Sequence, residues 1–237
     1  MTATRNIVPE LMDDPTLPSS EHDAALRGLA RLNTISFAHR ALCGIAMRAT
    51  RGLEHVTLLD VAAGSGDVSL AVARRLQAAG KRVSVTGVDV SGHAALAARA
   101  RFEAAGIKAR FETADALEDP LPTADLVMCT LFLHHLSDRE ITPLLARLTS
   151  ATNRVLLIND LRRGRAGLVA SMVVPRLVTR SPVVHVDAVR SYRAALTADE
   201  LRGFAKDAGL ANARVRHAFP YRMTLEWHSD AVAGSAS

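Results

Sequence analysis

An acidic side chain followed by a turn of small residues is the feature of this sequence best suited to chemistry. In residues 58–67, LLDVAAGSGD, an apolar run ends at Asp60 and a turn of alanine, glycine and serine precedes a helical pattern. Small residues let the backbone approach a ligand closely, and the following helix presents unpaired N–H groups there. A second apolar run, over residues 83–88, also ends in an acid, Asp89. This pairing is typical of α/β proteins that hold an adenosine-containing cofactor at their strand ends.

The elements that must position these acids follow from the alternation of apolar runs and helical patterns. The predicted strands are 56–62, 82–88, 109–113, 125–131 and 154–160, and the predicted helices between them are 69–79, 93–105 and 138–149. Apolar strands alternating with helices predict a parallel sheet covered on both faces. Thr197 and Glu200 form a capping box that opens a further helix, and two last strands follow at 213–218 and 221–227. We therefore predict a doubly wound α/β fold whose sheet has seven strands, mostly parallel, with the last strand antiparallel.

The pattern divides the chain into five parts. They are an irregular tail (1–20), an N-terminal helical cap (21–52), a cofactor-binding core (53–160), a helical lid or substrate insertion (161–196), and a C-terminal helix with a strand pair that completes the core (197–237). Within the insertion, residues 168–178 are mostly apolar and contain Pro175, which is compatible with a short helix pair or a lid.

Composition limits the class of protein. Of 237 residues, 49% are apolar and 22% charged, which is ordinary for a packed globular protein. No signal peptide and no apolar run of membrane-spanning length are visible, so we expect a cytoplasmic protein without a membrane span. The net charge is +5, but the arginines are scattered and only 4% of residues are aromatic. A solvated basic surface is therefore favoured over a nucleic-acid partner.

The motifs resemble those of the class I S-adenosylmethionine-dependent methyltransferases over roughly residues 54–227. The turn after Asp60 is similar to the first motif of that family, with Ala62 at the position of the first glycine. Asp89 matches the acid that ends the second strand, and Asp115 with Ala116 matches the motif near the adenine. The resemblance implies S-adenosylmethionine as cofactor. The cofactor-binding residues that it implies are Asp60, Ala62, Gly64, Ser65, Gly66, Asp89, Val90, Asp115, Ala116 and Thr130.

Two stretches are most similar to the ubiquinone/menaquinone methyltransferase group. The N-terminal signature of that group is matched by Asn33, Ser36, Phe37, His39 and Arg40. Residues 126–138 resemble its cofactor-contacting segment, except that His134 and His135 replace an Arg-Asn pair. This departure is closer to the small-molecule O-methyltransferases of secondary metabolism. The resemblance implies methylation of a small apolar or aromatic acceptor (phenolic, quinone or polyketide-like) at oxygen, with C-methylation of a quinone precursor as the alternative.

Methylation of a hydroxyl also requires removal of its proton. His134 and His135 follow the fourth predicted strand, and a histidine titrates near neutral pH, so they are the candidate general bases. Which of the two acts stays open. His39 is a second candidate, and His185 with Asp187 is a third.

The acceptor pocket is expected between the N-terminal helices and the 161–196 insertion, which are both apolar in stretches. The candidate substrate contacts are His39, Phe37, Met172 and Arg162. No cluster in the sequence has metal-ligand spacing, and the two adjacent histidines lack the carboxylates expected of a magnesium-dependent catechol site, so we expect no metal. The expected partner is a small-molecule acceptor, and the sequence leaves a homodimer open.

Three other functions are weighed against this interpretation. An RNA methyltransferase suits the net charge, but residues 130–133, TLFL, lack the acid or amide and the prolines that hold a flipped base. A nicotinamide-dependent dehydrogenase requires a third glycine where Ser69 stands. A non-catalytic binding module that keeps the cofactor fold is the third.

Overall fold

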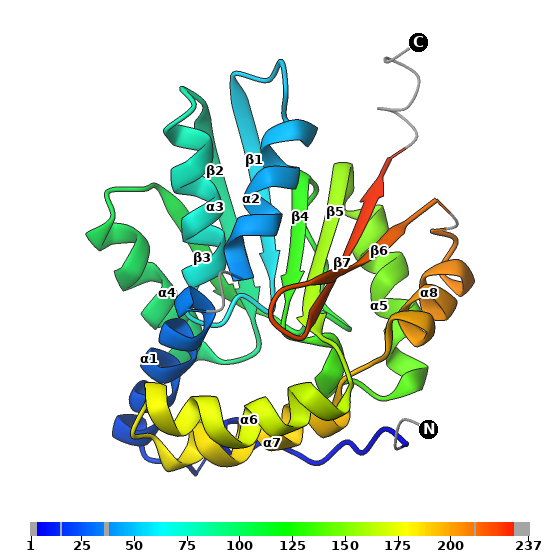
Figure 1. Cartoon of the computed structure of the whole chain (residues 1–237). Coiled ribbons are helices and arrows are strands. Elements are labelled where there is room, and N and C mark those ends of the chain that lie inside the picture. The colour runs from blue at the N-terminus through cyan, green and yellow to red at the C-terminus, as the bar shows by residue number, and fades with distance from the viewer. Residues whose placement is uncertain (1–3, 15, 36–37, 211, 230–237) are drawn as a thin grey trace.

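The computed structural model describes residues 4–14, 16–35, 38–210 and 212–229, and a seven-stranded sheet runs through its centre (Figure 1). The strands are β1 (His55–Val61), β2 (Arg82–Asp89), β3 (Ala109–Thr113), β4 (Ala124–Thr130), β5 (Thr152–Leu161), β6 (Arg214–Ala218) and β7 (Arg222–His228). Their order in the sheet is β3-β2-β1-β4-β5-β7-β6. Strands β1 to β5 are parallel, whereas β7 pairs antiparallel with both β5 and β6. The predicted fold class is confirmed.

Helices cover both faces of this sheet, so most residues of the central strands β1, β4 and β5 are buried. The α-helices are α1 (Ser19–Ile35), α2 (Ala38–Ala49), α3 (Asp67–Gln77), α4 (Gly92–Ala104), α5 (Asp138–Ser150), α6 (Arg165–Val178), α7 (Pro182–Ala194) and α8 (Ala198–Asp207), and two short 3-10 helices are η1 (Leu11–Asp13) and η2 (Leu133–His135). One core packs α2, α3 and α4 against the sheet, and a second core packs α5 and α8 against the other face. The helices and strands predicted between residues 56 and 160 all form, with their ends shifted by one or two residues.

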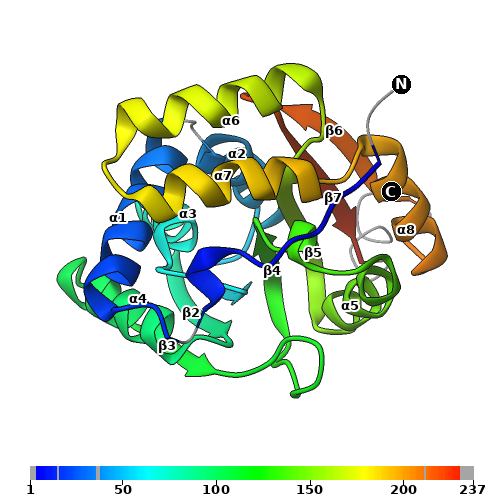
Figure 2. The same cartoon turned by 90° about the horizontal axis from the view of Figure 1, so that it is seen from below.

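A third layer lies across the carboxyl ends of the parallel strands. Helices α1, α6 and α7 run below these ends in Figure 1, and Figure 2 shows the N-terminal segment passing along α7 toward α1. The apolar 168–178 stretch lies within α6, which pairs with α7 as two full helices. The strand order reverses between β1 and β4, and ligands of open α/β sheets bind at the carboxyl side of such a switch point. The third layer therefore roofs the place where a ligand is expected.

No helix among the described residues is long and apolar enough to cross a membrane.

The predicted capping box of α8 forms in the structure. The Glu200 N–H donates to Thr197 Oγ1 (3.2 Å), and the Thr197 N–H donates to Glu200 Oε2 (2.8 Å). We expect Thr197→Ala to lower the free energy of unfolding by about 1 kcal/mol, because the helix N-terminus loses an acceptor. For a chain of this size that corresponds to roughly 2–4 °C in Tm, measurable by calorimetry. Ser150→Ala, at the exposed end of α5, is the matched control, and an equal effect of both changes would contradict the cap's contribution.

Candidate active site

The turn between β1 and α3 is built from left-handed backbone. Ala62, Gly64 and Gly66 have φ values of 55°, 53° and 66°. A non-glycine residue in this region costs about 1–2 kcal/mol, so Ala62 is strained, and such strain is concentrated at functional sites. A Cβ added at Gly64 would meet nothing within 4 Å, so the backbone there is open to a ligand. The neighbouring Ser65 is buried beneath the turn.

Asp60, at the carboxyl end of β1, is a buried acid whose charge is incompletely compensated. It is 1% exposed, and its Oδ1 atom has no hydrogen-bond partner. Burial raises the pKa of this carboxyl to about 7, the charges of Asp67 and Asp89 add to the effect, and a hydrogen bond with Ser69 acts in the opposite direction. A cationic group placed here would supply the missing partner.

Asp89 ends β2 and holds the same turn. Its Oδ2 accepts from the Gly64 N–H (2.7 Å), and its Oδ1 accepts from the Ser91 N–H (2.9 Å). Burial raises the pKa of Asp89, although both backbone hydrogen bonds act against the rise. Each carboxylate oxygen keeps a second lone pair, so Asp89 can also accept from two hydroxyls of a ligand. The following residue, Val90, is 72% exposed and offers an apolar surface beside it.

The other predicted cofactor residues follow the neighbouring strands. Asp115 lies beyond β3, where its Oδ1 accepts from the Leu117 N–H (2.8 Å), and Ala116 beside it is buried. Thr130 is the last residue of β4. Because β3, β2, β1 and β4 are adjacent and parallel, the structure brings all these positions to one edge of the sheet. Their role in binding a cofactor stays a prediction.

A histidine pair beside Asp89 was missed by the sequence interpretation. The rings of His22 on α1 and His93 on α4 meet edge to face, with centroids 4.5 Å apart, and Asp23 Oδ1 lies 2.7 Å from His93 Nε2. Burial lowers the pKa of His22, and the charge of His93 lowers it further. The buried Nδ1 of His22 has no partner. A periodic pattern cannot reveal this pair, because it forms only when α1 crosses α4.

His134, one of the two candidate bases, is held between two carboxylates. It is 4% exposed, its Nδ1 lies 2.6 Å from Asp160 Oδ1, and its Nε2 lies 3.7 Å from Glu10 Oε1. Burial acts to lower the pKa of His134, but Asp160 and Glu10 together raise it to about 10. The imidazole is then protonated at neutral pH and has no nitrogen free to accept a proton. A protonated imidazole does not suit a general base, so this arrangement does not favour His134 in that role, which stays a prediction.

His135 lies on the more open side of the same cluster. Its side chain is 26% exposed, its Nε2 lies 3.9 Å from Glu10 Oε1, and its Nδ1 lies 3.5 Å from Asp13 Oδ2. Carboxylates therefore lie beside both adjacent histidines, which removes the premise on which no metal was expected. Sequence reasoning missed Glu10 and Asp13 because they belong to the segment interpreted as an irregular tail.

The predicted pair of His185 and Asp187 does not form. His185 Nε2 lies 2.8 Å from the Thr179 carbonyl oxygen. Asp187 accepts instead from the N–H groups of Leu11 (2.8 Å) and Met12 (3.0 Å). Its function in the structure is to anchor η1, and with it Glu10, against α7.

Comparison with known proteins identifies the central part of the chain. Residues 58–154 match the family model described as a methyltransferase domain. This segment is a methyltransferase domain. It runs from the second half of β1 through β4 and includes the turn after Asp60, so the family resemblance of the motifs is confirmed for this part of the chain.

Solved structures share the fold of the methyltransferase domain and its flanking elements at low sequence identity. Magnesium protoporphyrin IX methyltransferase from Synechocystis PCC 6803, with bound SAH, is 20% identical with a TM-score of 0.58, over 92% of this chain and 90% of that one. A SAM dependent methyltransferase from Aquifex aeolicus is 18% identical with a TM-score of 0.61, over 90% and 99%. A putative O-methyltransferase from Nostoc punctiforme PCC 73102 is 18% identical with a TM-score of 0.64, over 95% of this chain but only 64% of that one. No curated protein sequence matches this chain.

The residues predicted to contact the acceptor lie on separate elements, whereas the acids of the methyltransferase domain lie at one edge of the sheet. Met172 on α6 is 39% exposed, Arg162 directly follows β5, and His39 is on α2, while Phe37 lies outside the described residues. A groove of about 570 Å³ does lie between α1 and the α6–α7 junction. Its lining includes Arg27, Arg31, Arg176, Arg180 and Leu177, so it is more cationic than the apolar pocket expected.

Proposed function

We propose that this protein transfers a methyl group from S-adenosylmethionine to an oxygen atom of a small apolar or aromatic acceptor. The observation that carries the proposal is the partnerless, buried carboxylate oxygen of Asp60 under the open turn of a methyltransferase domain. The negative charges of Asp67 and Asp89 also act on the Asp60 carboxyl group. S-adenosylmethionine carries a sulfonium and an ammonium group, so an acidic crevice suits it better than an anionic dinucleotide.

The residues of the turn fit the rest of the cofactor as well. Asp89 has lone pairs for the two ribose hydroxyls, and Gly64 leaves space for close approach of the amino-acid part. The family resemblance assigns Asp115 and Ala116, which follow β3, to the adenine. When bound, S-adenosylmethionine supplies the reactive methyl group, and the protein contributes binding, orientation and exclusion of water.

On the acceptor side, His135 is the better-placed of the two histidines. It is the more exposed, and Glu10 and Asp13 flank its two ring nitrogens. A positioned base that removes the hydroxyl proton contributes about 10²–10⁴-fold to the rate. Solved structures described as O-methyltransferases resemble this chain in fold, which supports oxygen as the methylated atom.

Titration calorimetry with S-adenosylhomocysteine tests the cofactor assignment. We expect binding to the unmodified protein and about 100-fold weaker binding to Asp89→Ala, because hydrogen bonds to a charged group contribute roughly 1.5–3 kcal/mol each. Asp207→Ala, at the exposed end of α8, is the control and should bind normally. Binding of NADH in place of S-adenosylhomocysteine would overturn the assignment.

The acceptor class is tested by transfer of a labelled methyl group to phenolic, quinone and carboxylate compounds. We expect an O-methyl product, identified by the chemical shift of the labelled carbon. A C-methyl product from a quinone precursor would contradict O-methylation and support the alternative, C-methylation. It would not affect the cofactor assignment.

A further inference from the structure

Two imidazoles and one carboxylate converge at the end of β4. Glu10 Oε1 lies 3.7 Å from His134 Nε2 and 3.9 Å from His135 Nε2, and one donor atom from each of the three residues lies within 4.8 Å of the others. The separations from Glu10 exceed hydrogen-bonding distance, so both Nε2 atoms face this carboxylate oxygen without bonding to it. The donors surround a common point.

The far side of each imidazole is held by another carboxylate. His134 Nδ1 is paired with Asp160 Oδ1 at 2.6 Å, and His135 Nδ1 faces Asp13 Oδ2 at 3.5 Å. Histidines that bind metals commonly donate their second ring N–H to a carboxylate, which fixes the ring and directs the other nitrogen to the ion. Both rings therefore have the orientation of metal ligands.

The segment that carries Glu10 is tied down along its length. The Asn6 N–H donates to the Arg193 carbonyl oxygen (3.0 Å), Arg190 Nη1 donates to the Pro9 carbonyl oxygen (2.6 Å), and Ser191 Oγ donates to Glu10 Oε1. The carboxylate is thus placed by many contacts, and its side chain is only 11% exposed.

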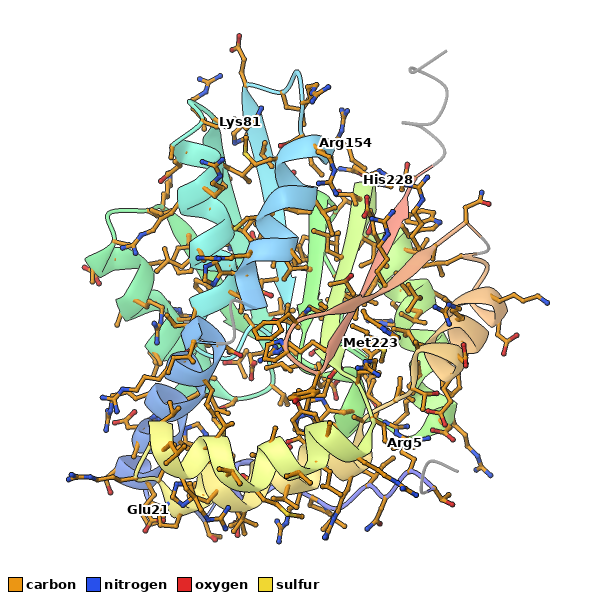
Figure 3. All side chains as sticks on the ribbon, in the orientation of Figure 1. Arg5, Glu21, Lys81, Arg154, Met223 and His228 are labelled. Carbon is orange, nitrogen blue, oxygen red and sulfur yellow. The ribbon has the colours of Figure 1, made fainter. Side chains whose placement is uncertain are left out.

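Arg5 joins the same segment to the histidine turn. Its Nε donates to the Ala194 carbonyl oxygen (2.6 Å), and its Nη2 donates to the Leu133 carbonyl oxygen (3.0 Å). Figure 3 shows Arg5 at the lower right, near the ends of α7 and α5. Both sides of the cluster are consequently held in one rigid unit.

We propose that Glu10, His134 and His135 bind one divalent transition-metal ion of the zinc class. Bonds of about 2.0–2.2 Å in tetrahedral geometry place ligand atoms roughly 3.4 Å apart. The two separations from Glu10 therefore need to contract by only a few tenths of an ångström, and the separation between the two imidazole donors, which is within 4.8 Å, by at most about 1.4 Å. Two imidazoles and a carboxylate suit zinc, iron, cobalt or nickel and are a poor site for Mg²⁺, which prefers oxygen. The ion takes the place of the proton between His134 and Glu10.

Three protein ligands leave one coordination position for a further ligand. The charge of Asp13 acts on both His135 and Asp89, so the cluster lies near the carboxyl end of β2 in the methyltransferase domain. If the proposed function holds, the open position takes an oxygen of the methyl acceptor, and His135 then acts as a metal ligand and not as the base that removes the hydroxyl proton. That part of the inference rests on the proposed function, whereas binding of the ion does not.

Calorimetric titration of the chelator-treated full chain with Zn²⁺ tests the site. We expect one Zn²⁺ per chain, no comparable binding of Mg²⁺, and a visible d–d spectrum with Co²⁺. His135→Ala and Glu10→Gln should each weaken Zn²⁺ binding by at least about 100-fold, and Asp13→Asn by about tenfold. Circular dichroism of each variant establishes that it is folded.

His55→Gln is the matched control, since His55 begins β1, at the opposite end from the crevice, and should leave Zn²⁺ binding unchanged. Absence of stoichiometric Zn²⁺ binding to the unmodified chain would sink the proposal, as would folded His135→Ala and Glu10→Gln chains that bind Zn²⁺ normally. S-adenosylhomocysteine binding is measured on the same samples. If the unmodified chain binds Zn²⁺ but not S-adenosylhomocysteine, the proposed function is contradicted. If it binds S-adenosylhomocysteine but not Zn²⁺, the metal site is contradicted.

Discussion

Asp60→Asn is expected to make the protein without cofactor more stable above pH 7 and to weaken its binding of S-adenosylmethionine. The pKa of Asp60 is raised from 3.8 to about 7 by burial. Such a group stabilises the fold below its unfolded pKa, and this contribution is lost as the pH rises toward the folded pKa. Above pH 7 the buried charge therefore costs up to about 4 kcal/mol. Because an asparagine brings its own unpaired polar groups, we expect a net gain of about 2 kcal/mol.

Urea unfolding at several pH values, without cofactor, measures this difference. Near pH 4, the stability of Asp60→Asn should be close to that of the unmodified protein, and its advantage should grow until about pH 7 and then level off. Asp207→Asn, an exposed carboxyl, should show no such growth. A difference that is constant across the pH range would show that Asp60 does not titrate near neutrality in the folded protein.

Although Asp60→Asn should raise the stability, it should lower the affinity for S-adenosylmethionine. A cationic cofactor pairs with the ionised form of Asp60, so the affinity for S-adenosylmethionine should rise as the pH approaches 7 and then become constant. Losing one partner of a buried charge pair costs about 2–5 kcal/mol, so Asp60→Asn should bind at least about 30-fold more weakly, without this pH dependence. A variant that binds with the original affinity and pH profile would remove Asp60 from the cofactor site.

Gly87→Ala is expected to damage both the fold and the cofactor turn. An added Cβ would lie 2.2 Å from an atom of the Phe111 ring, which is 2% exposed. The same ring packs 3.3 Å from the position of a Cβ on Gly66 and meets Phe102 at 5.1 Å between centroids. Overpacking of this kind costs roughly 1–3 kcal/mol. We expect a Tm lower by about 2–4 °C for each kcal/mol, together with weaker S-adenosylhomocysteine binding as the turn shifts.

Two further variants identify the cause of this effect. Gly87→Ala combined with Phe111→Leu should recover part of the lost stability, because the smaller side chain vacates the space of the ring. Gly203→Ala, on the exposed face of α8 with nothing near its Cβ, should be neutral or slightly stabilising. Equal stability of Gly87→Ala and the unmodified protein would contradict the packing described for Phe111.

The features that could be predicted from residue spacing are local ones. The apolar run into Asp60, the small-residue turn behind it and the Thr197 capping box each depend on neighbours a few residues away, so their spacing is readable directly. The alternation of strands and helices follows from periodicity, and a parallel arrangement of the core strands follows from that alternation. These signals were sufficient for the fold class and for placing the three acids at one edge of the sheet.

The contact partners of the charged side chains, in contrast, depend on how distant parts of the chain pack together. Glu10 reaches His134 because the N-terminal segment runs along α7. Asp187 accepts hydrogen bonds from that segment and does not pair with His185. Asp160 raises the pKa of His134 because β5 lies beside β4 in the sheet. Residue 87 must be glycine because the Phe111 ring on the neighbouring strand β3 occupies the space that a Cβ would need. Such contacts join residues far apart in the chain, and they depend on strand register and helix placement, which the spacing of residue types does not encode.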